Sequence, residues 1–253
     1  MDLGLGWTAF LCAAALGAGF VDAIAGGGGL ITVPALMAAG LPLDLVFGTN
    51  KGQSVFGSFA AVLRFGRGGM LDRTRAAASF PAGFVGSLLG AWLLLQVRPE
   101  VLRPVVLVLL PVAAAVVLLR PRPAAPRTAA PAHALLLLGA ISLAIGAYDG
   151  FFGPGTGTFL ILAFVGVLGM GPTQASADAK VVNFASNIGA AALFACRGTV
   201  VWRIALPMAA AQFAGGYLGA HCALRVGDRL VRGTVALVVL SLVAKLAYDL
   251  LRG

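Results

Sequence analysis

The run GFVDAIAGGGGLITVP at residues 19–34 interrupts an apolar segment with four consecutive glycines. Each glycine inside a helix costs roughly 1 kcal/mol relative to alanine, so the run predicts a helix that stops and restarts. Irregular backbone is tolerated at membrane depth only where it is buried in protein or lines a cavity. The backbone N–H groups freed at the start of the next helix suit an anion. Close helix packing is the other interpretation of the glycines. The residues that we expect at an anion site here are Gly26, Gly27, Gly28, Gly29 and Thr32.

The composition is that of a protein dissolved in lipid. Of the 253 residues, 60% are hydrophobic and 11% are charged, whereas a soluble domain carries about 25% charged residues. The charges cluster between long apolar runs, which predicts an all-α polytopic membrane protein. The net charge of +9 comes mostly from Lys and Arg near segment ends, so no nucleic-acid partner is expected. The cysteines and histidines are isolated, so neither a metal site nor a cofactor is expected.

Ten apolar segments make up the chain. Those at 51–65 and 156–170 are shorter than the roughly 20 residues of a full span, which favours discontinuous helices near a binding site. A basic, Pro-rich stretch at 120–132 is expected to be a cytoplasmic linker between the two halves, 1–119 and 133–253. The segments run at about 5–25, 29–47, 51–65, 76–97, 101–119, 133–152, 156–170, 178–196, 203–224 and 231–250.

The two halves align as homologous repeats of about four to five transmembrane segments each. Lys51 matches Lys180 at a shift of 129 residues, and Asp22 matches Asp149 at a shift of 127. Internal duplication is a hallmark of secondary transporters. The distribution of Lys and Arg does not decide between parallel and inverted repeats. Five segments per half favour inversion, because an odd number of crossings turns the second half over.

The polar motifs also occur in duplicate. The run GAYDGFFGPGTGT at 146–158 is the counterpart of the first glycine run. The stretches TNKGQS at 49–54 and DAKVVNFASN at 178–187 each place a lysine at the start of an apolar segment. A lysine inside the bilayer costs at least about 2.5–3.5 kcal/mol. We expect both ammonium groups to face one central anion; snorkelling to the interface or pairing with aspartate is the alternative. These stretches add Asn50, Lys51, Gln53, Gly153, Gly155, Thr156, Lys180, Asn183 and Asn187 to the expected substrate-binding residues.

Three acidic residues belong to the same motifs: Asp22, Asp149 and Asp178. An acid deep in apolar sequence is a candidate carrier for a coupled proton. A structural role is the alternative for Asp22 and Asp149, in which the carboxylate accepts hydrogen bonds from the glycine loop.

With these motifs the sequence resembles the TauE/SafE family, also called 4-toluene sulfonate uptake permeases or sulfite exporters, and within it the YfcA-like bacterial branch. The resemblance rests on DAIAGGGGLITVPAL at 22–36, TNK at 49–51, YDGFFGP at 148–154 and the stretch at 179–187, and it covers nearly the whole chain. It implies a multi-pass transporter of the bacterial inner membrane for sulfite, sulfonates or related anions. It also implies that the glycine-rich loops and the Lys-Asn stretches lie at the centre. It does not carry over a particular substrate.

We therefore expect a secondary transporter, more an exporter than an importer, that holds a small organic or sulfur-containing anion between two glycine-rich loops and works by alternating access. Export of an anion from a negative-inside cell is downhill by about 2.3 kcal/mol per charge per 100 mV. The expected partners are this anion and the lipid bilayer, and a homodimer is left open. No enzyme is expected, since HExxH and a GxSxG with a plausible triad are absent. An anion channel, a non-transporting scaffold and an intramembrane enzyme are the alternatives.

Overall fold

The computed structural model describes residues 4–98, 133–227 and 229–230. This part of the chain holds eight helices and no strand, which confirms the all-α prediction for it. The segments at 101–119 and 231–250, and the linker at 120–132, lie outside the described residues. The helices are α1 (Leu5–Ala25), α2 (Gly29–Ala38), α3 (Leu43–Arg67), α4 (Arg73–Gln96), α6 (Ala134–Phe151), α7 (Thr156–Gly166), α8 (Pro172–Cys196) and α9 (Trp202–Val226).

Four of the described helices are long and apolar enough to cross a membrane: α1, α4, α6 and α8. Helices α3 and α9 have 25 residues each, which gives a length of about 37 Å and exceeds the roughly 30 Å of the hydrocarbon core. They fall short of the same hydropathy because polar residues interrupt them. Helices α2 and α7 are short and apolar. The chain is therefore a multi-pass membrane protein with two short helices inside it.

Both predicted glycine breaks are present. Helix α1 stops before Gly26 and α2 starts at Gly29, while α6 stops at Phe151 and α7 starts at Thr156. The backbone between the helices adopts positive φ angles, which only glycine takes up without strain. The glycines concerned are Gly26 (φ 78°), Gly27 (92°), Gly153 (92°) and Gly155 (87°).

One predicted boundary is wrong. The sequence analysis placed a short segment at 51–65 and started it at Lys51, but the short helix of the first half is α2, and Lys51 lies well inside the long helix α3. Likewise Lys180 lies inside α8 and not at the start of a segment. The error arose because polar side chains lower the hydropathy without ending a helix. The chain turns instead at Gly40–Pro42, where Gly40 has a φ of 83°.

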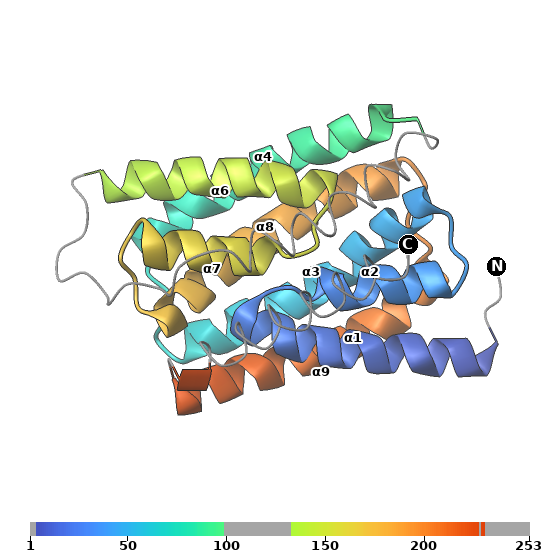
Figure 1. Cartoon of the computed structure of the whole chain (residues 1–253), viewed down its shortest axis with the longest axis horizontal. Coiled ribbons are helices and arrows are strands. Elements are labelled where there is room, and N and C mark those ends of the chain that lie inside the picture. Colours follow the sequence, from blue (N-terminus) through green and yellow to red (C-terminus); the bar gives the residue numbers. More distant parts are fainter. Residues whose placement is uncertain (1–3, 99–132, 228, 231–253) are drawn as a thin grey trace, which may run out of the picture.

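The helices of the two halves interleave. Helix α1 packs along α9, and α4 packs along α6. At the centre α3 and α8 pack against each other, α3 also against α9 and α8 also against α4. Figure 1 shows α3 and α8 running in opposite directions, as do α1 and α6. Neither half therefore forms a separate body among the described residues.

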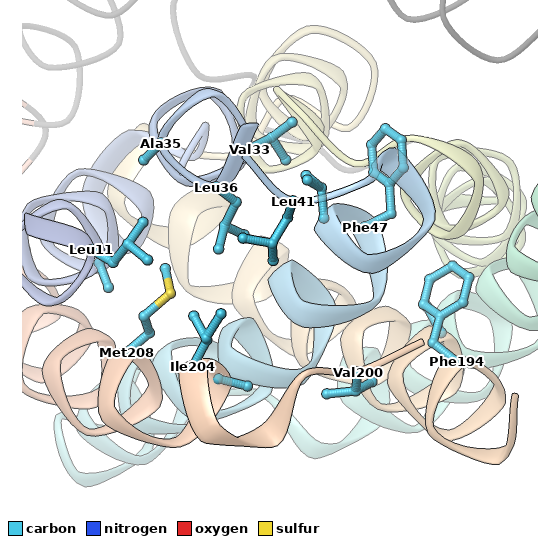
Figure 2. Packing of buried hydrophobic residues seen from close by; sticks show 14 of the residues in the cluster. Leu11, Val33, Ala35, Leu36, Leu41, Phe47, Phe194, Val200, Ile204 and Met208 are labelled. Atoms are coloured by element: carbon cyan, nitrogen blue, oxygen red, sulfur yellow. The ribbon is translucent and has the colours of Figure 1, made fainter. Parts of the chain in front are cut away.

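The apolar core forms three clusters around a polar centre. Figure 2 shows the first of them, which contains Leu36 of α2, Phe47 of α3 and Met208 of α9. A second cluster contains Phe65 near the end of α3, and a third contains Phe164 of α7. Along α3 the polar side chains of residues 49–54 thus lie between two apolar anchors. The core positions this polar stretch at the middle depth of the helix bundle.

Candidate functional site

Two buried lysine–aspartate pairs connect the two halves of the chain. Lys51 Nζ lies 2.7 Å from Asp149 Oδ2, and Lys180 Nζ lies 2.8 Å from Asp22 Oδ2. Each lysine is the ninth residue of a 25-residue helix, about 12 Å along it. Both lysine side chains are buried, so neither one snorkels to the interface. Of the alternatives for the two lysines, pairing with aspartate is the one observed.

Asp149 is surrounded by donors. Besides the ammonium group of Lys51, its carboxylate accepts hydrogen bonds from the hydroxyl groups of Thr156, at 2.7 Å, and Ser186. Lys51 is held in turn, since its Nζ donates to Asn187 Oδ1 at 3.2 Å. The Asp149 side chain is only 5% exposed. We call this pair closed, because Asp149 accepts from three side chains.

Asp22 has fewer partners and more exposure. Its Oδ1 accepts a hydrogen bond of 3.0 Å from the backbone N–H of Gly28, and its Oδ2 faces Lys180. The side chain is 18% exposed, whereas Lys180 is fully buried. An N–H group freed by the glycine break is therefore occupied by a carboxylate of the protein itself. This contact fits the structural role that the sequence left open for Asp22.

The two glycine breaks touch each other. A Cβ added to Gly157 would lie 2.6 Å from the Cα of Gly26, so no larger residue fits between them. The last carbonyl groups of α1 accept hydrogen bonds from the second half: Ala25 from the hydroxyl of Thr158 at 3.0 Å, and Ala23 from that of Ser176 at 2.9 Å. These hydroxyls satisfy the end of a helix that stops inside the protein.

A pocket lies beside these elements and is partly open to the outside. Most of the predicted binding residues line it, together with both candidate proton carriers of the ion pairs. The lining residues are Asp22, Gly27, Gly28, Gly29, Asn50, Lys51, Ser54, Asp149, Gly153, Thr156, Gly157, Asn183, Asn187 and Gln212.

Other predicted residues lie behind the lining. Thr32 Oγ1 and Gln53 Nε2 both donate to Asn50 Oδ1, at 2.6 and 3.2 Å. Because the Asn50 oxygen is used twice, its amide group is left with N–H donors to offer the pocket. Lys180 contacts the pocket only indirectly, because its ammonium group pairs with Asp22, which is part of the lining. The predicted residues outside the lining are Gly26, Thr32, Gln53, Gly155, Lys180 and Asp178.

Asp178 pairs with a residue far from the pocket. Its Oδ2 lies 2.7 Å from Arg75 Nε, at the start of α4, and Arg75 is the more exposed partner. The pair fastens α8 to α4, and the pocket lining does not include Asp178. The sequence grouped Asp178 with Lys180 because they are two positions apart, but residues at that spacing point to different sides of a helix.

The sequence analysis missed three lining residues: Ser54, Gly157 and Gln212. Ser54 and Gly157 belong to motifs that it quoted. Gln212 lies outside every motif, on α9. The sequence does contain an indication of its role, because a glutamine in the apolar segment 203–224 needs a polar partner or a function.

Charge is balanced over the two ion pairs at the pocket, of which Asp22, Lys51 and Asp149 line it and Lys180 lies outside the lining. The lysines of the two pairs carry as much positive charge as the aspartates carry negative charge. Amide and hydroxyl groups supply further donors along the lining. Chemically, this arrangement suits a small anion that replaces an aspartate as the partner of a lysine, since a buried ammonium needs a negative partner.

Comparisons with known proteins identify the family of the chain. The family model described as "Sulfite exporter TauE/SafE" matches residues 11–246. The chain is 37% identical to "Probable membrane transporter protein ORF9" of Sinorhizobium sp. over 248 residues, which covers 98% of this chain and 95% of the relative. It is 38% identical to "Probable membrane transporter protein YfcA" of Escherichia coli K12 over 232 residues, 92% and 86% of the two chains.

A third relative, "Probable membrane transporter protein" of Haemophilus influenzae, is 36% identical over 249 residues and 98% of each chain. No solved structure matches the chain. The match to the family model and the near full-length identity to membrane transporters leave one conclusion: the chain belongs to the TauE/SafE family of membrane transporters.

Proposed function

We propose that the protein is a secondary transporter that exports a small organic or sulfur-containing anion by alternating access. The observation that carries this proposal is the duplicated buried pair, Lys51–Asp149 and Lys180–Asp22, beside a pocket between two broken helices. Buried ionisable groups at membrane depth are costly and mark ion and substrate pathways. Broken helices at the centre of two halves are the usual place for such a site.

The charge balance of the pocket suits a carrier. With both pairs formed, the empty site is neutral, so it changes sides without moving charge. The loaded site carries the anion, and its outward movement is downhill by about 2.3 kcal/mol per charge per 100 mV. No ATP-binding motif or enzymatic motif is needed for this step. In the uptake direction a proton taken up by Asp22 would keep the loaded site neutral, which makes Asp22 the stronger candidate for coupling than the closed Asp149.

We also propose that the halves are inverted repeats in the bacterial inner membrane. Helices α3 and α8 both have 25 residues and begin 129 residues apart, the shift that aligns their lysines. Their opposite directions in Figure 1 fit inversion. The relatives are bacterial membrane transporters, which supports the location. Crosslinking in the membrane would test whether the protein forms a homodimer.

The test is flux in proteoliposomes made with the purified protein. The anions are sulfite, sulfate, sulfoacetate, taurine, an aryl sulfonate and small carboxylates, and current on a supported membrane is the readout. We expect saturable current with one chemical group of anions. The Lys180→Met variant, which cannot exchange Asp22 for a substrate, should lose it. Protein-free liposomes and denatured protein are the controls.

Each other outcome has a meaning. Current that does not saturate with concentration would identify an anion channel and overturn the carrier mechanism. No current and no substrate exchange with any anion would overturn anion transport and favour a scaffold. Saturable flux that Lys180→Met and Lys51→Met leave intact would place the substrate away from the ion pairs.

A further inference from the structure

Gln212 is a buried polar side chain whose position no part of the proposed mechanism explains. It lies on α9, is 2% exposed and lines the pocket. Its Oε1 is buried without a hydrogen-bond partner among the described residues. An unsatisfied buried polar atom costs stability, so a native protein that keeps one has a use for it. Asn183, also in the lining, has an unpartnered Oδ1 of the same kind.

Two glycines make the space that Gln212 occupies. A Cβ on Gly57 of α3 would lie 2.5 Å from Gln212 Cγ, and a Cβ on Gly19 of α1 would lie 2.9 Å from the same atom. Both distances are too short for real contacts, so alanine at either position would displace the glutamine. The side chain is thus held between α1 and α3. Gly19 lies three residues before Asp22 on α1, so the two share one face of that helix.

The other half of the molecule fills the equivalent space differently. The shift of 129 residues aligns Gly57 with Ser186 and Gln212 with Gly83. Ser186 donates its hydroxyl to Asp149 and closes that pair. At the position of Ser186 the first half has a glycine, and the long side chain comes from α9 instead. The group that would close the pair at Asp22 is therefore replaced by a carboxamide with an unused oxygen.

We propose that Gln212 is a substrate-contacting residue, and that the anion binds off centre, beside the open Asp22–Lys180 pair. This inference rests on the proposed anion transport. The carboxamide carries two N–H donors and one acceptor, and rotation about the last side-chain bond exchanges their places. It thereby donates to an oxygen of the anion. A neutral donor of fixed position distinguishes anions by the placement of their oxygens, which a lysine alone does not do.

The test measures binding to the full-length protein in detergent by titration calorimetry, with sulfite, methanesulfonate and acetate as probes. These anions differ in the number and placement of oxygens. Gln212→Met keeps the size of the side chain and removes its hydrogen bonds. We expect the Kd of the best probe to rise about tenfold or more, as for the loss of a hydrogen bond to a charged group. We also expect the ratio of Kd values among the probes to shrink.

A second variant protects the test from a folding defect. Gly57→Ala keeps the glutamine at position 212 but displaces its side chain. This variant should therefore raise the same Kd. Gln174→Met is the matched control: Gln174 donates to the carbonyl of Met70, outside the pocket lining. It should leave the Kd unchanged, and thermal melting checks that all variants fold.

The outcomes separate this inference from the function on which it rests. If the wild type binds a probe and both Gln212→Met and Gly57→Ala bind it within twofold, Gln212 has a packing role and the inference is overturned. If the wild type binds no probe and transports none of the anions above, the proposed function fails and the inference fails with it.

Discussion

The two lysine–aspartate pairs use the same residue types, one from each half of the chain, yet their surroundings differ. Asp149 accepts from Lys51 and from two hydroxyl groups, Thr156 and Ser186. Asp22 accepts from Lys180 and one backbone N–H, and is more exposed. By the shifts of 127 and 129, the positions of the two hydroxyls correspond to glycines, Gly29 and Gly57. If the halves are repeats, as proposed above, the site has kept its charges and changed its hydrogen bonds.

The difference suggests that the two pairs have different roles. A carboxylate that accepts from three side chains is held more firmly than one that accepts from a single side chain and one backbone N–H. The first pair then serves stability and the second serves binding. Each of the following experiments would strengthen or remove this contrast.

The largest effect is expected from removing one charge of the closed pair. Lys51→Met leaves Asp149 buried without its counter-ion, and breaking a buried pair costs about 3–5 kcal/mol. Lys180→Met should cost less, because the exposed side of Asp22 can gain water. Thermal melting in one detergent measures both. The double variant Lys51→Met with Asp149→Asn should recover most of the lost stability, since no charge is left unpaired. Equal losses for the two single lysine variants would remove the contrast.

The hydroxyl groups around Asp149 come next. Ser186→Ala and Thr156→Val each remove a hydrogen bond to a carboxylate, which is worth about 1.5–3 kcal/mol. Both should lower the melting temperature. Thr156→Ser keeps the hydroxyl group that donates to Asp149, so its melting temperature should stay close to that of the wild type. Ser142→Ala is a suitable control, because Ser142 only donates to a carbonyl within its own helix. Losses no larger than this control would show that Asp149 does not depend on its hydroxyls.

Asp22→Asn should affect both transport and folding. The amide oxygen still accepts from Lys180, but the buried ammonium loses its counter-ion, and the side chain no longer takes up a proton. We expect uptake driven by a pH gradient to fall about tenfold, while exchange of labelled for unlabelled anion at equal pH continues. Asp149→Asn should lower the melting temperature more, because Thr156 and Ser186 also lose their charged acceptor. If Asp22→Asn keeps gradient-driven uptake, the proton is carried elsewhere or not at all.

The smallest effect is expected outside the pocket, at Asp72, which caps the start of α4. The backbone N–H of Arg75 donates to its carboxylate at 2.8 Å, and this hydrogen bond holds the pKa of the exposed Asp72 below its ordinary value of 3.8. A lowered folded-state pKa adds stability above the unfolded value, and this stability is lost as the pH falls through the folded value.

The melting temperatures of the wild type and Asp72→Ala should therefore differ slightly at neutral pH and converge in acid. A difference that grows in acid would contradict this sign. The same variant is a control for transport, because any pH dependence of flux near neutrality should persist in it.

The sequence predicted the helical fold, the two glycine breaks and most of the pocket lining, because these depend on local patterns. Four glycines in an apolar run end a helix wherever they occur. Which aspartate meets which lysine was left open, since the pairs cross between halves and depend on the packing of α3 against α8. Lys51 was assigned to a segment start because hydropathy cannot distinguish a buried polar stretch from a loop. Gln212 was missed because its seat is made by glycines on two other helices.

Because the helices of the two halves interleave, some contacts of the first half form only after much of the second half has been synthesised. Asp22 and Lys180 are 158 residues apart, so at about 5–20 residues per second the acid waits roughly 8–30 s on the ribosome–translocon complex for its counter-ion. During this time α1 lacks both Lys180 and its packing partner α9. A chain truncated after the first half therefore keeps an unpaired acid in an apolar helix and becomes a substrate for membrane proteases. Two halves produced from separate genes should survive only when they are made together.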